Sequence, residues 1–187
     1  MVYKKGDKEF FLVVNASNIE KDYSWMLENS KGFDVEIINQ SDYYGEVAVQ
    51  GPKAYEAIEK YLEMPVNDLT FYTFKELDYE GEKIIVSRTG YTGEDGFELY
   101  GSHAFINNVW DKLIESGEVK PCGLGCRDTL RFEVGLPLYG HELSDTITPL
   151  EAGLGPFFKV DKQKFLRKEA ISKEKEEGLK RKGRGIE

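Results

Sequence analysis

The 187-residue sequence has little of what metal, membrane and nucleic-acid proteins are built from. The two cysteines lie four residues apart and the two histidines lie elsewhere, so the sequence has no obvious zinc-ligand set. No run approaches the roughly 18 apolar residues of a membrane span. The 25 basic residues are outnumbered by 34 acidic ones, and a net charge of -9 disfavours a groove for nucleic acid. We therefore predict no metal site, no membrane span and no nucleic-acid partner.

The sequence also lacks a secretory signal and a recognisable nucleophilic triad. Met1-Val2-Tyr3-Lys4-Lys5 is not followed by an apolar block, which predicts a cytoplasmic protein. Cys126 stands beside Arg127, which favours a thiolate, but it has no evident histidine partner, so nucleophilic catalysis is disfavoured. We interpret Cys122 and Cys126 as buried or half-buried thiols. The 40% of hydrophobic residues predicts a globular chain.

Alternation and helical spacing predict a β-α-β unit at the start of the chain. We expect a strand at 10–14, a capping box at 17–20 that opens a helix, and a returning strand at 35–39. The apolar face of that helix consists of Ile19, Tyr23, Met26 and Leu27.

A longer series of elements begins at residue 46. We expect strands at 46–50, 71–79, 83–88 and 96–100. One helix follows Gly51-Pro52, and a second starts near Ser102. With a last strand at 119–123, this order predicts an α+β fold, a ferredoxin-like split β-α-β sheet with helices on one face. A short helix at 127–134 and a solvated charged segment from 172 complete the prediction.

A glycine-punctuated turn at 90–96 is the strongest sign of a binding site. Its three glycines permit backbone geometry that other residues disfavour. Glu98 alternates with apolar neighbours, so its side chain is predicted to point away from the apolar side of the strand, where it can bind paired N–H donors. The alternative is a solvated strand residue at Glu98 and a turn aromatic at Tyr91. Glu94 and Asp95 disfavour phosphate in this turn.

Two further polar residues are candidates, each with a structural alternative. Asn15 ends a predicted strand before a helix, where its amide either faces a ligand or caps the helix. Arg127 lies four residues before Arg131 on one helix face. It either receives a ligand carboxylate with its planar fork or belongs to a surface ion pair with Glu133.

Several sequence blocks, taken in order, resemble a known family. They span 13–18, 48–54, 87–99, 125–130 and 135–155, the last with Leu-Tyr-Gly-His-Glu and Thr-Pro-Leu-Glu-Ala-Gly-Leu-Gly segments. Together they resemble the tetrahydrofolate-dependent aminomethyltransferases, the T-protein family of the glycine cleavage system. The Lys-Gly-Cys-Tyr-like motif of related iron–sulfur assembly proteins is absent from the sequence.

The resemblance implies a reaction and a set of site residues. The reaction is methylene transfer from an aminomethyl-dihydrolipoyl carrier protein, the H-protein, to tetrahydrofolate, with release of ammonia. In the family, the folate lies in a central hole between three domains. The resemblance places Glu98 at the amino-pyrimidinone edge of the pterin, Tyr91 against the folate, Asn15 near the pterin and Arg127 among the ligand-binding arginines.

The resemblance also implies a central fragment. The key aspartate of the family lies in an Asp-Asp-Leu-Ile-Val-like segment that would precede Met1, and a C-terminal barrel domain would follow Glu187. We therefore expect no catalytic residue in this sequence and no activity of the chain alone.

We divide the sequence into a remnant of the first domain at 1–45, a ferredoxin-like folate-binding domain at 46–135, a return segment at 136–171 and a charged tail at 172–187. Apolar surface exposed by truncation predicts a homodimer. The alternatives to the enzyme are a non-catalytic folate-binding or assembly module and a generic α+β domain.

Overall fold

The computed structural model describes residues 1–183 and divides the chain into two units, residues 1–130 and the residues from 131 onward. The finer division into four segments stays a prediction. Residues 184–187 of the predicted charged tail lie outside the described residues.

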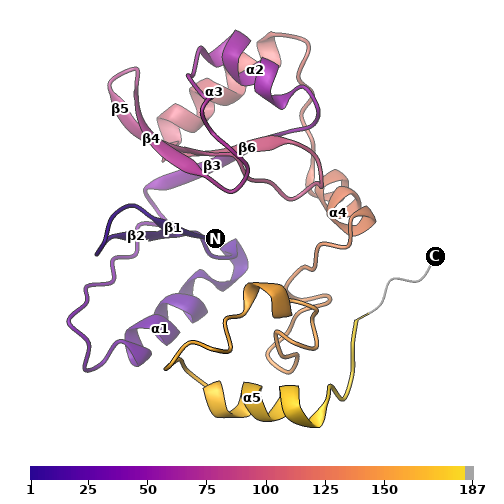
Figure 1. Cartoon of the computed structure of the whole chain (residues 1–187). Helices are drawn as coiled ribbons and strands as arrows, with labels where there is room; N and C mark the ends of the chain where they lie inside the picture. Colours follow the sequence, from indigo (N-terminus) through magenta and orange to yellow (C-terminus); the bar gives the residue numbers. More distant parts are fainter. Residues whose placement is uncertain (184–187) are drawn as a thin grey trace. The chain divides into compact units, whose positions relative to one another are not determined.

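A four-stranded antiparallel sheet with the order β3-β6-β5-β4 forms the centre of the first unit (Figure 1). The strands are β3 (Tyr44–Gln50), β4 (Phe74–Tyr79), β5 (Glu82–Ser87) and β6 (Gly96–Ser102). Strands β4 and β5 form the predicted hairpin, and β6 lies between β3 and β5. The register pairs Ala48 of β3 and Ser87 of β5 with Glu98 of β6.

Two helices, α2 (Ala54–Leu62) and α3 (His103–Glu115), cover one face of this sheet (Figure 1). Alternation along the strands turns Val47, Phe97 and Leu99 toward the helices, where they are buried. Ile58 of α2 and Val109 of α3 are fully buried against them. The side chain of Ser102 caps α3 by accepting the backbone N–H of Phe105 at 3.2 Å.

A short hairpin packs on the other face of the sheet. It consists of β1 (Val2–Lys4) and β2 (Phe10–Leu12), which pair antiparallel. Tyr3 of β1 is buried together with Ile85 and Tyr100 of the sheet. The β-α-β unit predicted for the first 45 residues is therefore wrong: β2 pairs with the preceding strand, and residues 35–39 form no strand. The polar turn at 5–8 between two apolar runs was the available signal for the hairpin.

The start of the first helix also differs from the prediction. A 3₁₀ turn at Ala16–Asn18 precedes α1 (Ile19–Asn29), and Asn18, at the helix start, makes no side-chain capping bond. The predicted capping box with Ser17 is thus wrong. Asn15 caps the 3₁₀ turn instead, because its Oδ1 accepts the backbone N–H of Ser17 at 2.9 Å.

The α+β class is confirmed, with two corrections of topology. Residues 119–123 form no strand and do not join the sheet. The three antiparallel pairings make β3 and β4 run in opposite directions at opposite edges, whereas a split β-α-β unit needs parallel strands. The predicted helix at 127–134 is present as α4 (Leu124–Glu133).

The second unit has little regular structure within its described residues. It contains a 3₁₀ turn at Gly155–Phe157 and α5 (Lys168–Glu177), which is largely solvated as predicted for the charged segment. Arg131 is buried and donates through Nη1 to Glu142 at 2.7 Å and to the carbonyl of Leu136 at 3.1 Å. This carboxylate contact allows the guanidinium charge to be buried.

Candidate functional site

The helix-free face of the sheet carries two carboxylates on adjacent strands. Glu98 of β6 lies opposite Ala48, and Glu46 of β3 lies opposite Tyr100. Residues two apart on a strand share a face, so these four side chains form one patch, with the two glutamates as diagonal neighbours. The buried neighbours of Glu98 on the other face, Phe97 and Leu99, confirm that Glu98 points away from the core.

A network of buried hydroxyl groups holds the Glu98 carboxylate. Thr89 and Tyr100 both donate to Oε2 of Glu98, the latter at 3.0 Å. The Tyr3 hydroxyl lies 3.0 Å from that of Ser87 and 3.2 Å from that of Tyr100, and the Ser87 and Thr89 hydroxyls are 2.6 Å apart. Since both bonds to Glu98 reach the same oxygen, Oε1 keeps its acceptor capacity within the described part of the chain.

Burial keeps Tyr100 protonated, so that it serves as a donor. Burial, assisted by the nearby carboxylates of Glu46 and Glu98, raises the pKa of Tyr100 far above its ordinary value of 10.0. The phenol therefore donates to Glu98 over the whole neutral range.

Glu46 titrates near neutrality because of the same surroundings. Protein atoms that displace water from its carboxyl, together with the Glu98 carboxylate, raise the pKa of Glu46 from 4.5 to about 7. Arg127 and the terminal ammonium group of Met1 act in the opposite direction. The patch thus combines one well-anchored acceptor with one carboxyl that changes charge around pH 7.

The glycine turn between β5 and β6 is built around the side chain of Gln50. Gln50 Nε2 donates to the carbonyls of Thr89 at 3.1 Å and Phe97 at 3.4 Å. A Cβ atom at Gly90 would lie 1.9 Å from Gln50 Oε1, and one at Gly96 would lie 2.3 Å from its Nε2. The two glycines therefore make room for this amide, which fixes the turn from the end of β3.

An ion pair braces the same turn from the other side. Arg88 donates through Nε and Nη2 to the two carboxylate oxygens of Asp95, at 2.9 and 2.7 Å. Gly93, between them in sequence, has a φ of 77°, which a glycine adopts without strain. The Asp95 charge, which disfavours phosphate in this turn, thus has the Arg88 guanidinium as its partner.

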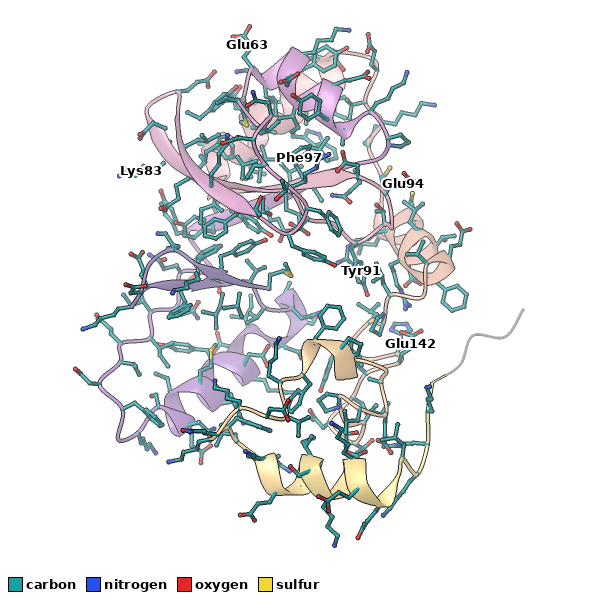
Figure 2. The ribbon with its side chains drawn as sticks, in the orientation of Figure 1. Glu63, Lys83, Tyr91, Glu94, Phe97 and Glu142 are labelled. Carbon is teal, nitrogen blue, oxygen red and sulfur yellow. The ribbon has the colours of Figure 1, made fainter. Side chains whose placement is uncertain are left out.

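Tyr91 and Arg127 meet beside this turn. The guanidinium carbon of Arg127, in α4, lies 4.5 Å from the centroid of the Tyr91 ring, a cation–π contact. Figure 2 shows Tyr91 on the side of the sheet away from Phe97, the side that carries Glu98. Because Arg127 also lowers the pKa of Glu46, its charge acts on the carboxylate patch.

The structure also bears on two further predictions, one for Asn15 and one for the two cysteines. The oxygen of the Asn15 side chain accepts the Ser17 N–H, which is the capping alternative, so its ligand role stays a prediction. Cys122 and Cys126 are exposed, not buried as predicted. A hydrogen bond with Cys122 raises the pKa of the Cys126 thiol, the reverse of the effect expected from Arg127.

Most of the residues that hold the Glu98 carboxylate and the glycine turn were not among the binding residues predicted from the sequence. Tyr100 was detectable, because it stands two residues after Glu98 on the same face. Tyr3, Ser87 and Gln50 join the site through strand pairing and long-range packing, which no local pattern signals.

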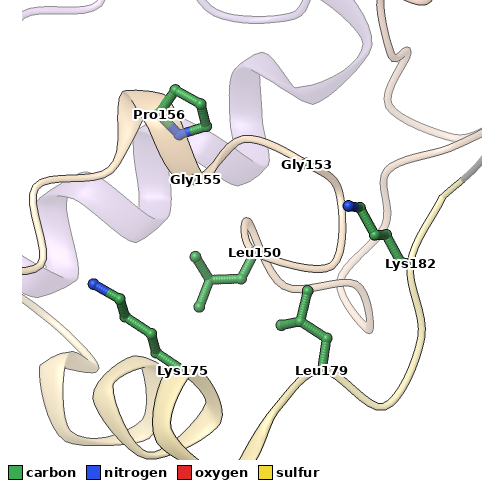
Figure 3. Close-up of a pocket in the computed structure, with 7 residues that line it drawn as sticks. All are labelled: Leu150, Gly153, Gly155, Pro156, Lys175, Leu179 and Lys182. Atoms are coloured by element: carbon green, nitrogen blue, oxygen red, sulfur yellow. The ribbon is translucent and has the colours of Figure 1, made fainter.

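The second unit contains a cavity of about 290 Å³. Leu150 and Leu179 line it together with Lys175 and Lys182 (Figure 3). Its lining includes none of the residues predicted to bind a ligand.

None of the helices within residues 1–183 is long and apolar enough to cross a membrane. In the same residues, no three histidine, cysteine or acidic side chains are grouped as a metal site.

The fold defines a class of protein by comparison with a solved structure. The crystal structure of glycine cleavage system aminomethyltransferase T from Bartonella henselae superposes with a TM-score of 0.82 at 30% identity. The match covers 90% of this chain and 46% of that one. The sheet with its covering helices is therefore the arrangement of an aminomethyltransferase T-protein.

The sequence comparisons agree with this class. The family model described as the GCVT N-terminal domain matches residues 1–162. Aminomethyltransferases of Thermoanaerobacter sp. (strain X514) and Lysinibacillus sphaericus are 53% and 52% identical over 191 residues, covering 100% of this chain and 52% of each relative. The chain belongs to the GCVT N-terminal domain family and spans about half the length of these relatives.

Proposed function

We propose that this chain forms the tetrahydrofolate-binding part of an aminomethyltransferase of the glycine cleavage system. The reaction moves the methylene group from an aminomethyl-dihydrolipoyl carrier protein, the H-protein, to tetrahydrofolate and releases ammonia. Membership of the GCVT family supports the reaction class and these partners.

The observation that carries the proposal is the anchored Glu98 carboxylate. Its Oε2 is occupied by Tyr100 and Thr89, while Oε1 remains an acceptor on the helix-free sheet face. The pterin edge presents a ring N–H and an exocyclic amine, and a carboxylate accepts both with charge-assisted bonds. The chemistry of the residues therefore fits the group.

Tyr91 and Arg127 extend this fit. The Tyr91 ring offers an apolar surface for the folate, and the guanidinium above it supplies a positive charge next to two carboxylates. The planar fork of Arg127 suits a carboxylate of the ligand. Asn15 is proposed near the pterin through its amide nitrogen, which its capping bond does not use.

Calorimetry with the full 187-residue chain tests the site. We expect 5-formyltetrahydrofolate, a stable tetrahydrofolate, to bind, and Glu98→Gln to weaken binding about 100-fold, because the amide replaces a charged acceptor and adds a clashing donor. Glu94→Gln is the matched control, since Glu94 is an exposed carboxylate of the same turn. Binding that is equal in both variants, or absent from the wild-type chain, would reject the proposal in favour of a non-catalytic assembly module.

A further inference from the structure

Four hydroxyl groups and one carboxylate form a closed ring of hydrogen-bond contacts at the helix-free face of the sheet. The members of the ring are Tyr3, Ser87, Thr89, Tyr100 and Glu98. The four hydroxyl residues are almost fully buried, with exposed fractions of at most 4%. Buried hydroxyl groups have little access to water, so each depends on the others for its hydrogen bonds.

The number of protons in the ring fixes the direction of these bonds. An ionised carboxylate has no proton to donate, and each hydroxyl has one. Tyr100 and Thr89 use theirs on Oε2 of Glu98. Ser87 is therefore the donor in its 2.6 Å contact with Thr89, and Tyr3 is the donor in its 3.2 Å contact with Tyr100. Since the Ser87 proton is also used, Ser87 can only accept from Tyr3, at 3.0 Å.

Two arms of hydrogen bonds thus start at Tyr3 and end on the same carboxylate oxygen. One arm passes through Tyr100, and the other passes through Ser87 and Thr89. The remaining contacts, from Tyr3 to Thr89 and from Ser87 to the Glu98 carbonyl, are longer, at 3.5 Å, and therefore weaker. Hydrogen bonds that point the same way along a chain strengthen one another, so the Tyr3 proton supports both bonds to Oε2.

The Tyr3 hydroxyl can be removed without disturbing the packing that places it. The Tyr3 ring meets the ring of Phe74 with centroids 5.0 Å apart and that of Tyr100 with centroids 5.8 Å apart, both edge to face. These ring contacts dock the β1-β2 hairpin on the sheet and do not involve the oxygen. Tyr3→Phe therefore deletes the start of both arms and retains the ring.

We propose that Tyr3 is a positioning residue of the binding site, which acts through both arms to hold Oε2 of Glu98, so that Oε1 is the oxygen offered to the N–H donors of a ligand. The identity of the ligand as a reduced folate rests on the proposed function. The orientation of the carboxylate does not.

The carbon-13 resonance of the Glu98 side-chain carboxyl, assigned with Glu98→Gln, tests the orientation without a ligand. We expect this resonance to shift in Tyr3→Phe and in Tyr100→Phe. Tyr44→Phe is the matched control and should leave it in place, because Tyr44 belongs to the same aromatic cluster but its hydroxyl is not part of the ring. A Glu98 resonance that is unmoved in Tyr3→Phe would overturn the proposal, whether or not folate binds.

Calorimetry with 5-formyltetrahydrofolate and the full chain measures the consequence for binding. The dissociation constant should rise about tenfold in Tyr100→Phe, which loses one hydrogen bond to a charged group, and about threefold in Tyr3→Phe, which lies one bond further away. Equal affinities of Tyr3→Phe and Tyr44→Phe would contradict the positioning role. A wild-type chain that binds no folate would reject the proposed function, and the carboxyl resonance would still decide the role of Tyr3.

Two substitutions of Thr89 separate the hydroxyl from the packing. Thr89→Val retains the shape and loses the hydroxyl, so it should move the Glu98 resonance and weaken folate binding about tenfold. Thr89→Ser retains the hydroxyl and should keep both properties of the wild type. Equal effects of the two variants would assign the change to packing and overturn the role of the hydrogen-bond arms.

Discussion

Glu46→Gln isolates the energetic effect of the second carboxylate of the sheet. The native structure raises the pKa of Glu46 from 4.5 to about 7, so the folded chain binds this proton more tightly than the unfolded chain does. The stabilisation is fully present below the unfolded pKa and is lost as the pH rises through about 7. Ionisation of Glu46 near the Glu98 carboxylate therefore destabilises the folded chain at alkaline pH.

The size of this destabilisation follows from the pKa shift of Glu46 and from the exposure of its side chain. The shift corresponds to an upper bound of about 3 kcal/mol, at 1.36 kcal/mol for each pKa unit. Because Glu46 is exposed on the sheet, solvent screening reduces the expected value to about 1 kcal/mol. The glutamine variant should match the wild type near about pH 4, below the unfolded pKa of Glu46, and be about 1 kcal/mol more stable near about pH 8.

Urea unfolding followed by circular dichroism at several pH values measures this difference. Glu36→Gln is a suitable control, because it removes one negative charge from an exposed residue outside any helix or strand. The control should show no comparable pH-dependent gain. A stability difference between Glu46→Gln and wild type that stays constant from acid to alkaline pH would refute the reasoning.

Two further substitutions test the packing of each unit by urea unfolding. Phe97→Ala should lower the free energy of unfolding by about 3–5 kcal/mol, because Phe97 is fully buried between the sheet and its helices (Figure 2). Phe71→Ala, at an exposed phenylalanine, should lower it by less than about 0.5 kcal/mol. Similar losses in the two variants would contradict the assignment of Phe97 to the core. Glu142→Ala should cost about 2 kcal/mol, because it removes the carboxylate from the buried Arg131 guanidinium. Glu142→Gln, which retains an acceptor oxygen, should recover part of that loss, and an unchanged stability in Glu142→Ala would show that the ion pair contributes nothing.

The sequence was most informative where local periodicity coincides with burial. Alternation around Glu98 was sufficient to predict its direction, because Phe97 and Leu99 must face the core. The helix after Ser102 was equally predictable from its apolar spacing and its cap. The predicted strands at 35–39 and 119–123 failed because apolar content alone does not supply a pairing partner for a strand.

What the sequence determined by itself is the family, the α+β class and the identity of the candidate binding residues, because each depends on residue types in a fixed order. Only the tertiary structure decided how those residues are held. Packing of the β1-β2 hairpin on the sheet brings Tyr3 to the hydroxyl network under Glu98, and the pairing of β3 with β6 brings Gln50 to the glycine turn, in both cases from positions far apart in the chain. Hydrogen bonds and electrostatic interactions depend on distance in space, and a linear pattern specifies only distance along the chain.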